Sequence, residues 1–269
     1  MSEPTARGSD HVQSLARGLA VIRAFNASRP ELTLSEVARE TNLTRAAARR
    51  FLHTLVDLGY VRTDGRLFAL TPRILELGYA YLSSLSLPEV AQPHLERLVA
   101  EVQESASVAL LDDVDVVYVA RVATSRIMRV TINIGTRFPA HATSMGRVLL
   151  AGLAPGDLDA YLERVELRPF TQHTVTSEPT LRGELDRVRN QGWAYVDQEL
   201  EEGLRSIAAP IRNSGGRVVA AVNMSSHASR TSLESARRDL LPQLLAAAAR
   251  IEADLIAMST AEAGPALSR

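Results

Sequence analysis

The segment spanning residues 32–70 constrains the fold more than any other part of this chain, because it combines two short helical patterns, a sharp turn and a hairpin signal. Thr33 is followed three residues later by Glu36, the reciprocal arrangement that caps a helix start. Asn42 falls where the chain must turn, since Asn tolerates the left-handed backbone region. Thr44 is then expected to cap a second helix. The segment therefore predicts a helix-turn-helix.

The second helix of this unit has one apolar face and one basic face. The residues expected to face a core recur at helical spacing: Ala48, Phe51, Leu52 and Leu55. The opposite side would present Arg45, Ala46, Arg49, Arg50 and His53. Guanidinium groups match guanine edges and phosphates, so this face is typical of a helix that enters a major groove.

A hairpin pattern follows directly, with residues 60–70 alternating in polarity around a turn at Asp64-Gly65. We expect it to form a wing that supplies Arg62 and Arg66. A helix before the unit would complete a three-helix core, with Ser14 as its cap and an apolar face of Leu15, Leu19, Ile22 and Phe25.

These features predict specific contacts with DNA. Arg45 and Arg49 are expected to contribute to base reading, and phosphates would be held by Arg50, Thr33, Thr44 and the two wing arginines. The alternative is that the arginines are only a solvated helix face. The adjacent wing and the third helix favour DNA binding over that alternative.

Length and charge predict two domains with different partners. Residues 1–75 carry 11 arginines and 7 acidic residues, whereas residues 76–269 carry 19 arginines and 24 acidic residues. Only the first part is therefore expected to touch nucleic acid. All 30 basic side chains are arginine, which we interpret as codon bias, so the arginine count alone is weak evidence.

Other composition features argue against several functional classes. The chain has no cysteine, so a disulfide framework and thiolate chemistry are excluded. Its six histidines show no metal-ligand spacing, and Ser144 does not lie in a nucleophile elbow, so we expect neither a cofactor, a metal nor catalysis. The first residues lack a signal pattern and no apolar run reaches membrane-spanning length, which predicts a soluble, cytoplasmic protein without a membrane partner.

The periodicity divides the chain into three parts. Residues 11–71 would form the winged helix-turn-helix, residues 72–87 a linker helix that starts at Pro72 and ends at a break at Leu87-Pro88, and residues 88–258 a second domain. Its pattern of short strands and helices predicts an α+β domain with an antiparallel sheet. The expected strands are 107–111, 116–122, 127–134, 193–197, 207–211 and 218–224. The expected helices begin near residues 91, 144, 155, 180 and 233, the last one bent at Pro242.

The chain resembles the IclR family of bacterial transcriptional regulators over nearly its whole length. The resemblance rests on HATSMGRVLLAGL (141–153), GWAYVDQELEEGLRSIAAPI (192–211) and VVAAVNMSS (218–226). The run TRAAARRFLHTLVDLGYV (44–61) is more particularly similar to the PcaR and PobR-like branch, which controls protocatechuate and β-ketoadipate catabolism. The resemblance implies a GAF-like effector-binding domain, a homodimer or a dimer of dimers (homotetramer), and a small organic acid as effector.

The resemblance also implies an effector pocket lined by Ala142, Met145, Gly146, Asp197 or its neighbour Val196, Ser206, Asn223 and Ser225. Each residue has a structural alternative, because small polar residues in strands often satisfy backbone groups and Met145 suits a core. Some family members carry a thiol near Ser206 and hydroxyls at Asn223, so the effector's identity does not transfer. A carboxylate would also need a cation or strong donors, for which the candidates are Arg129, His141 and Arg205.

Together these features predict a sequence-specific DNA-binding transcriptional regulator controlled by an aromatic or dicarboxylic acid. Its partners would be an operator inverted repeat in double-stranded DNA, the effector, further copies of the chain and RNA polymerase. One alternative is a DNA-binding module whose second domain only oligomerises. An enzyme acting on a small acid is the other.

Overall fold

The computed structural model describes residues 11–26, 28–82, 86–124 and 132–262. The chain divides into two compact units, Met1–Ser83 and Ser84–Arg269. No helix in the described ranges is long and apolar enough to cross a membrane.

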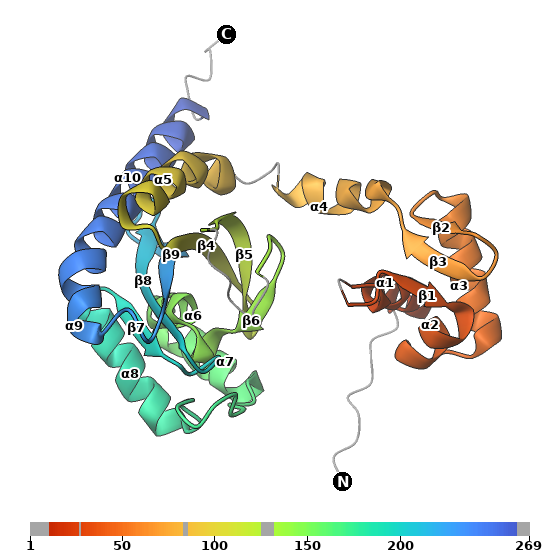
Figure 1. The fold of residues 1–269 in the computed structure, drawn as a ribbon, viewed down its shortest axis with the longest axis horizontal. Helices are drawn as coiled ribbons and strands as arrows, with labels where there is room; N and C mark the ends of the chain where they lie inside the picture. The colour runs from red at the N-terminus through yellow and green to blue at the C-terminus, as the bar shows by residue number, and fades with distance from the viewer. Residues whose placement is uncertain (1–10, 27, 83–85, 125–131, 263–269) are drawn as a thin grey trace. The chain divides into compact units, whose positions relative to one another are not determined.

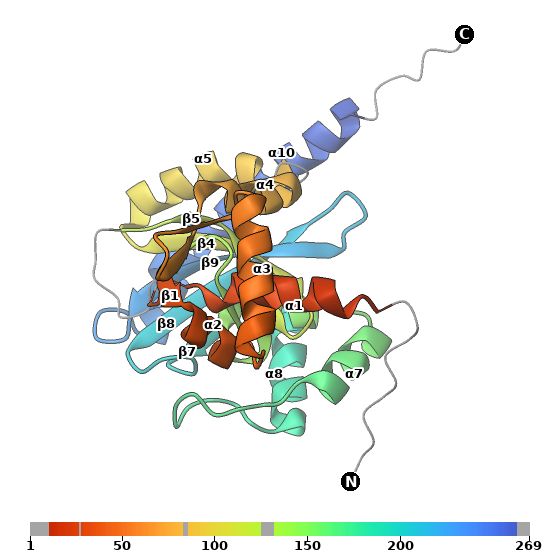
Figure 2. The same cartoon turned by 90° about the vertical axis from the view of Figure 1, so that its right-hand side faces the viewer.

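The N-terminal unit is a three-helix core with a small sheet. Its helices are α1 (Gln13–Ala24), α2 (Leu34–Glu40) and α3 (Arg45–Asp57), and its strands are β1 (Glu31–Thr33), β2 (Val61–Thr63) and β3 (Leu67–Leu70). The antiparallel sheet has the order β1-β3-β2, with β2 and β3 forming the hairpin (Figure 1). In Figure 2, α3 is seen along its full length within this unit. The unit is a winged helix-turn-helix.

Local sequence signals explain most of this unit. Thr33 and Glu36 form the predicted capping box at the start of α2. Asn42 adopts the left-handed conformation with φ 53°, and Thr44 caps α3 by accepting a hydrogen bond from the Ala47 N–H. In the hairpin, the Asp64 carboxylate accepts hydrogen bonds from the N–H groups of the two residues after Gly65. These predictions are confirmed.

The prediction for the first helix was wrong in two respects. Val12 rather than Ser14 is the N-cap residue, and it makes no side-chain cap. Leu15 and Leu19 are 63% and 48% exposed. Phe25, directly after the helix, is buried and Ile22 packs against the core, as predicted, but the helix also buries Val21, and its Gly18 lies against Phe51 of α3, so the buried face is rotated away from Leu15 and Leu19.

The connecting segment begins where predicted but ends earlier. Thr71 caps a short 3-10 turn, η1 (Pro72–Ile74), which continues into α4 (Leu75–Leu82). The predicted break at Leu87-Pro88 was wrong, because both residues belong to α5 (Ser86–Val102). Proline is tolerated in the first turn of a helix, where its missing N–H would have no partner within the helix.

The C-terminal unit is a six-stranded antiparallel sheet with helices on both faces. Its strands are β4 (Ser105–Asp112), β5 (Asp115–Val122), β6 (Arg137–Pro139), β7 (Ala194–Asp197), β8 (Leu204–Arg212) and β9 (Val218–His227), in the order β6-β5-β4-β9-β8-β7. On one face, α5 and α10 (Leu241–Glu262) form one apolar core with the sheet (Figure 1). The other face packs against α6 (Ser144–Ala151), α7 (Pro155–Arg164) and α8 (Glu178–Gln191).

Two further predictions concern the edges of this unit. The predicted strand 127–134 lies outside the described residues as far as residue 131, residues 132–134 are not strand, and the edge strand is β6. The helix predicted from residue 233 consists of three parts, α9 (Leu233–Ser235), a π-helical turn η3 (Ala236–Leu240) and α10, and the irregularity lies before Pro242 rather than at it. Pro242 is the second residue of α10, just after this turn, and its missing N–H removes an α-helical hydrogen bond to the preceding turn.

Candidate DNA-binding face and effector cavity

The basic face of α3 is free to meet a partner. Ala48, Leu52 and Leu55 are buried, which turns the opposite side of the helix outwards. The residues exposed on that side are Arg45, Ala46, Arg49, Arg50 and His53. None of the three arginines forms an ion pair within the described parts of the chain, so their guanidinium groups are available for phosphates and base edges.

The two capping threonines differ in whether their hydroxyl groups can still donate a hydrogen bond. The Thr33 hydroxyl donates to Glu36 Oε2 at 2.7 Å and accepts from the Glu36 N–H, so both of its functions are used within the capping box. The Thr44 hydroxyl accepts from the Ala47 N–H at 3.2 Å and retains a proton to donate. Of the two predicted hydroxyl donors, only Thr44 remains available for a phosphate.

The wing arginines also differ. Arg62 Nη2 on β2 lies 2.9 Å from Glu31 Oε1 on β1, on the other side of the central strand β3. This pair is exposed and is therefore weak enough to exchange for a phosphate. Arg66 is exposed and has no ion pair among the described residues. His53 packs edge-on against Phe68 of the wing with 6.4 Å between ring centroids, which joins α3 to the hairpin.

A narrow cavity of about 20 Å³ lies in the C-terminal unit, where the N-terminus of α6 meets the sheet. Its polar lining consists of Thr143, Ser144, Ser206, Asn223 and Ser225. Its apolar lining consists of Tyr118, Ile132, Ala142, Val196, Leu200 and Leu204. Among the residues that the structure describes, no charged side chain lines it.

Four residues of the predicted pocket meet in this cavity, from three different elements: Ala142, Ser206, Asn223 and Ser225. The other three do not line it. Met145 is fully buried in the core between α6 and the sheet. Gly146 packs against the backbone of Ala140, where any Cβ would overlap the carbonyl group. Asp197 binds Arg205, whereas its neighbour Val196 lines the cavity.

Two buried polar atoms of the cavity lining have no hydrogen-bond partner among the described residues: Ser144 Oγ and Asn223 Oδ1. Asn223 Nδ2 donates to Ser225 Oγ at 3.2 Å, which fixes the orientation of the amide. The Thr143 hydroxyl caps α6 by accepting from the Gly146 N–H. Since buried polar groups normally have partners, the two free atoms indicate a site for a polar ligand.

The side chains predicted to bind an effector carboxylate make other contacts in the structure. Arg205 forms a bidentate pair with Asp197, at 2.6 Å and 3.0 Å, and also donates to two backbone carbonyls. This pairing lowers the pKa of Asp197. His141 is buried against Phe170, and burial lowers its pKa, which favours the neutral ring. Arg129 lies outside the described residues.

Sequence reasoning missed a buried ion pair beside the cavity. Arg147 Nη2 on α6 lies 2.7 Å from Glu199 Oε2, and the same carboxylate oxygen accepts from the Val175 N–H at 3.0 Å. Burial raises the pKa of Glu199, and Arg147 opposes this shift. Glu199 is followed by Leu200, which lines the cavity, so the pair fixes one wall of it. The two partners are 52 residues apart, and no local pattern signals them.

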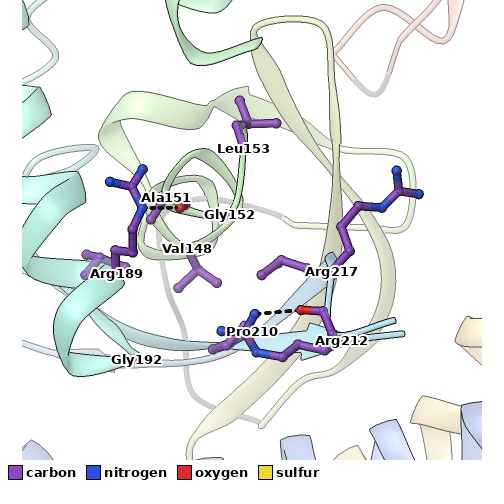
Figure 3. Close-up of a pocket in the computed structure, with 12 residues that line it drawn as sticks. Val148, Ala151, Gly152, Leu153, Arg189, Gly192, Pro210, Arg212 and Arg217 are labelled. Atoms are coloured by element: carbon purple, nitrogen blue, oxygen red, sulfur yellow. Dashed lines mark hydrogen bonds between the residues drawn. The ribbon is translucent and has the colours of Figure 1, made fainter. Parts of the chain in front are cut away.

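A second hollow lies near the other end of α6, and Figure 3 shows its lining. Arg189 Nε donates to the Ala151 carbonyl, and Arg212 Nη1 donates to the Gly216 carbonyl. Figure 3 shows Arg217 extending away from these two side chains. The C-terminal end of a helix carries partial negative charge. Arg189 meets this end of α6, and neither of the two unpartnered atoms, Ser144 Oγ and Asn223 Oδ1, lies in this hollow.

A basic helix-turn-helix with a wing, joined to a separate domain that contains a small polar cavity, defines a DNA-binding regulator of the ligand-responsive class. Residues 14–65 match the IclR helix-turn-helix domain, and residues 79–253 match the domain described as bacterial transcriptional regulator IclR C-terminal. The chain belongs to the IclR family of bacterial transcriptional regulators.

Individual relatives agree with this assignment. The chain is 46% identical over 239 residues to the Pca regulon regulatory protein of Pseudomonas putida, covering 88% of this chain and 82% of that protein. It is 60% identical to a putative transcriptional regulator from Rhodococcus sp. RHA1, with a TM-score of 0.83 and coverage of 92% and 100%. An IclR homologue from Microbacterium hydrocarbonoxydans in complex with 4-hydroxybenzoate is 29% identical, with a TM-score of 0.79 and coverage of 91% and 99%. These relatives are transcriptional regulators, not enzymes, in agreement with the sequence prediction.

Proposed function

We propose that this regulator binds an inverted-repeat operator through α3 and the wing, and that a small aromatic acid in the cavity at the N-terminus of α6 controls this binding. Arg45 and Arg49 would contribute to base reading, whereas Arg50, Thr44 and the wing arginines would hold phosphates. Because its partner is the bacterial chromosome, we place its action in the cytoplasm.

The observation that carries the effector assignment is the pair of unpartnered buried atoms, Ser144 Oγ and Asn223 Oδ1, in one cavity. The first N–H groups of α6 and the Ser144 hydroxyl would bind a carboxylate, since helix N-termini attract anions. The Asn223 amide oxygen would accept a hydrogen bond from a ring hydroxyl. Tyr118 and Leu200 provide apolar surface for the ring.

Several exposed apolar side chains support a dimer, or a dimer of dimers. Val12, the N-cap residue of α1, and Leu15 and Leu19 within it are spaced so that they share one face, and they are 60%, 63% and 48% exposed. Leu75 and Leu77 at the start of α4 are also exposed. Large exposed side chains on two helices of a DNA-binding unit are typical of an association surface. Two copies would present two recognition helices to an inverted repeat, and the effector would shift operator affinity or contact with RNA polymerase.

A thermal-shift measurement tests the effector assignment. We expect 4-hydroxybenzoate or protocatechuate to raise the melting temperature of the full chain, because a ligand at 100 times its dissociation constant stabilises by about 2.7 kcal/mol. Ser144→Ala and Asn223→Ala should reduce the shift, whereas Ser214→Ala, on the exposed turn between β8 and β9, should not. No shift with any small acid would favour a C-terminal unit that only oligomerises.

The operator assignment is tested by selecting DNA sequences from a random pool with the purified protein. The expected result is a sequence with twofold symmetry. Enrichment of a single asymmetric half-site would contradict the proposed dimer.

A further inference from the structure

The hollow near the C-terminal end of α6 has the composition of an anion site. Its volume is about 260 Å³, just below the roughly 300–1,000 Å³ of typical small-ligand sites. Three elements contribute arginines to its lining: Arg189 from α8, Arg212 from the end of β8 and Arg217 from the turn before β9. Among the described residues, no acidic side chain lines it. Figure 3 shows Arg189 on one side of the hollow and Arg212 on the other, with Val148 between them.

The inner wall of the hollow is apolar. Val148 and Val188 are buried, whereas the three arginines are exposed, so the valines lie at the bottom and the guanidinium groups at the rim. Gly152 lets the end of α6 approach β9, because a Cβ at this position would lie only 2.7 Å from Val218 Cβ. The bottom of the hollow is therefore shaped by closely packed elements, and only its rim consists of long side chains.

Arg189 offsets the negative end of the helix at this hollow. Its Nε donates to the Ala151 carbonyl at 3.1 Å, in the last turn of α6, where the helix carries partial negative charge. Its Nη1 lies 2.7 Å from Asp186 Oδ1. Its Nη2 has no partner in the described parts of the chain. The helix end is thus already compensated, and the charge of the other two arginines remains.

Arg212 and Arg217 supply that remaining charge. Arg212 Nη1 donates to the Gly216 carbonyl at 3.1 Å, and Glu252 accepts a hydrogen bond from the backbone N–H of Arg212 rather than from its guanidinium. Neither arginine forms an ion pair with any residue that the structure describes. Two exposed guanidinium groups beside an apolar hollow, without carboxylates in its lining, favour a ligand that carries more than one negative charge.

We propose that this hollow binds a small phosphorylated molecule with an apolar part, as a second ligand besides the effector. A phosphate group offers three terminal oxygens, so more than one guanidinium fork can bind it. The phosphate lies at the rim between Arg212 and Arg217, whose long exposed side chain can turn over the opening, and the apolar part covers Val148 and Val188. The site uses no residue of the effector cavity, so this inference goes beyond the proposed function and does not depend on it.

Calorimetric titration of the full chain at constant ionic strength tests this inference, with phenyl phosphate and inorganic phosphate as probes. Both carry a phosphate group, and only phenyl phosphate has an apolar part. We expect phenyl phosphate to bind at one site per chain and more tightly than inorganic phosphate. Arg212→Gln/Arg217→Gln should weaken its binding by roughly 10- to 100-fold, because charge-assisted hydrogen bonds are lost. Equal affinities for the two probes would overturn the assignment of an apolar part.

Arg168→Gln/Arg187→Gln is the matched control, because it removes the same number of charges from exposed side chains of the same unit. It should leave the affinity for phenyl phosphate unchanged. Equal weakening by both double variants would show a response to net charge alone and would overturn the inference.

Two further variants locate the bound probe. Loss of phenyl phosphate binding in Arg49→Gln/Arg50→Gln would place the probe on α3, and loss in Ser144→Ala would place it in the effector cavity. Either result overturns the inference. Binding of 4-hydroxybenzoate without binding of either phosphate would also overturn it, while leaving the proposed function intact.

Discussion

Arg147 and Glu199 form an ion pair in the interior of the C-terminal unit, with 2.7 Å between Nη2 and Oε2 and both side chains less than one-tenth exposed. The pair joins the N-terminal half of α6 to the loop after β7, which also includes Leu200 of the cavity wall. Arg147 Nε donates to the His141 carbonyl as well. The polar network therefore couples the two segments that would surround a bound acid.

Removing one partner of this pair should be costly. Glu199→Leu would leave the Arg147 guanidinium buried without its closest carboxylate, and we expect it to lower the free energy of unfolding by about 3–5 kcal/mol. The double variant Arg147→Met/Glu199→Leu should recover much of this loss, because it leaves no buried charge uncompensated. Urea denaturation of both single variants and the double variant measures the coupling. Additive losses would show that the two side chains stabilise the unit independently.

Gly146 illustrates a residue whose role is steric. A Cβ at this position would overlap the Ala140 backbone, so Gly146→Ala should destabilise the unit by about 3 kcal/mol, the upper end of the usual cost of overpacking. Gly183→Ala is the control: it lies in α8 with nothing within 4 Å of a Cβ, and should stabilise by about 0.5–1 kcal/mol. Thermal denaturation distinguishes the two. A well-folded Gly146→Ala protein with an unchanged melting temperature would show that the backbone at Ala140 can shift freely.

The comparison of sequence and structure shows where local reasoning is sufficient. Thr33, Asn42 and Thr44 were assigned correctly, because caps and turns depend on residues a few positions away. The face of α1 was assigned correctly at Ile22 and Phe25 and wrongly at Leu15 and Leu19, since tertiary contacts with α3 decide which side is buried. A β-bulge at Val119, opposite β4, depends on pairing between strands and has no signature within β5 itself.

The effector site shows the same limit. The family resemblance implied an effector pocket that includes Ser206, Asn223 and Ser225, and these three residues line one cavity, whose role as the effector site stays a prediction. Arg147 and Glu199 were missed because their pairing depends on how α6 and the loop after β7 approach each other in the folded unit. Long-range contacts of this kind follow from the complete topology, not from the spacing of residues.

The arginines of α3 should divide into two functional groups. Arg49→Ala should reduce the difference in affinity between the selected operator and a scrambled duplex, because base contacts carry about 1–3 kcal/mol of discrimination. Arg50→Ala should weaken binding to both duplexes. It should also reduce the slope of log affinity against log salt concentration by about one, which corresponds to one released counterion. Fluorescence anisotropy at several salt concentrations measures both effects, and Arg187→Ala in the other unit is the control. Identical changes in the two variants would contradict the division.

His141 should make the stability of the C-terminal unit depend on pH. Burial lowers its pKa below the usual value of 6.5, and the nearby Arg147 contributes to the same shift, whereas the Arg168 carbonyl and Asp115 oppose it. The folded state therefore binds fewer protons than the unfolded state, so this contribution is fully present above pH 6.5 and is lost as the pH falls below it. Denaturant unfolding from pH 7.5 to 5 should show a decreasing free energy, with a smaller slope for His141→Gln. His173→Gln, which changes an exposed histidine, should retain the slope of the unmodified protein, and an equal slope in all three proteins would exclude His141 as its source.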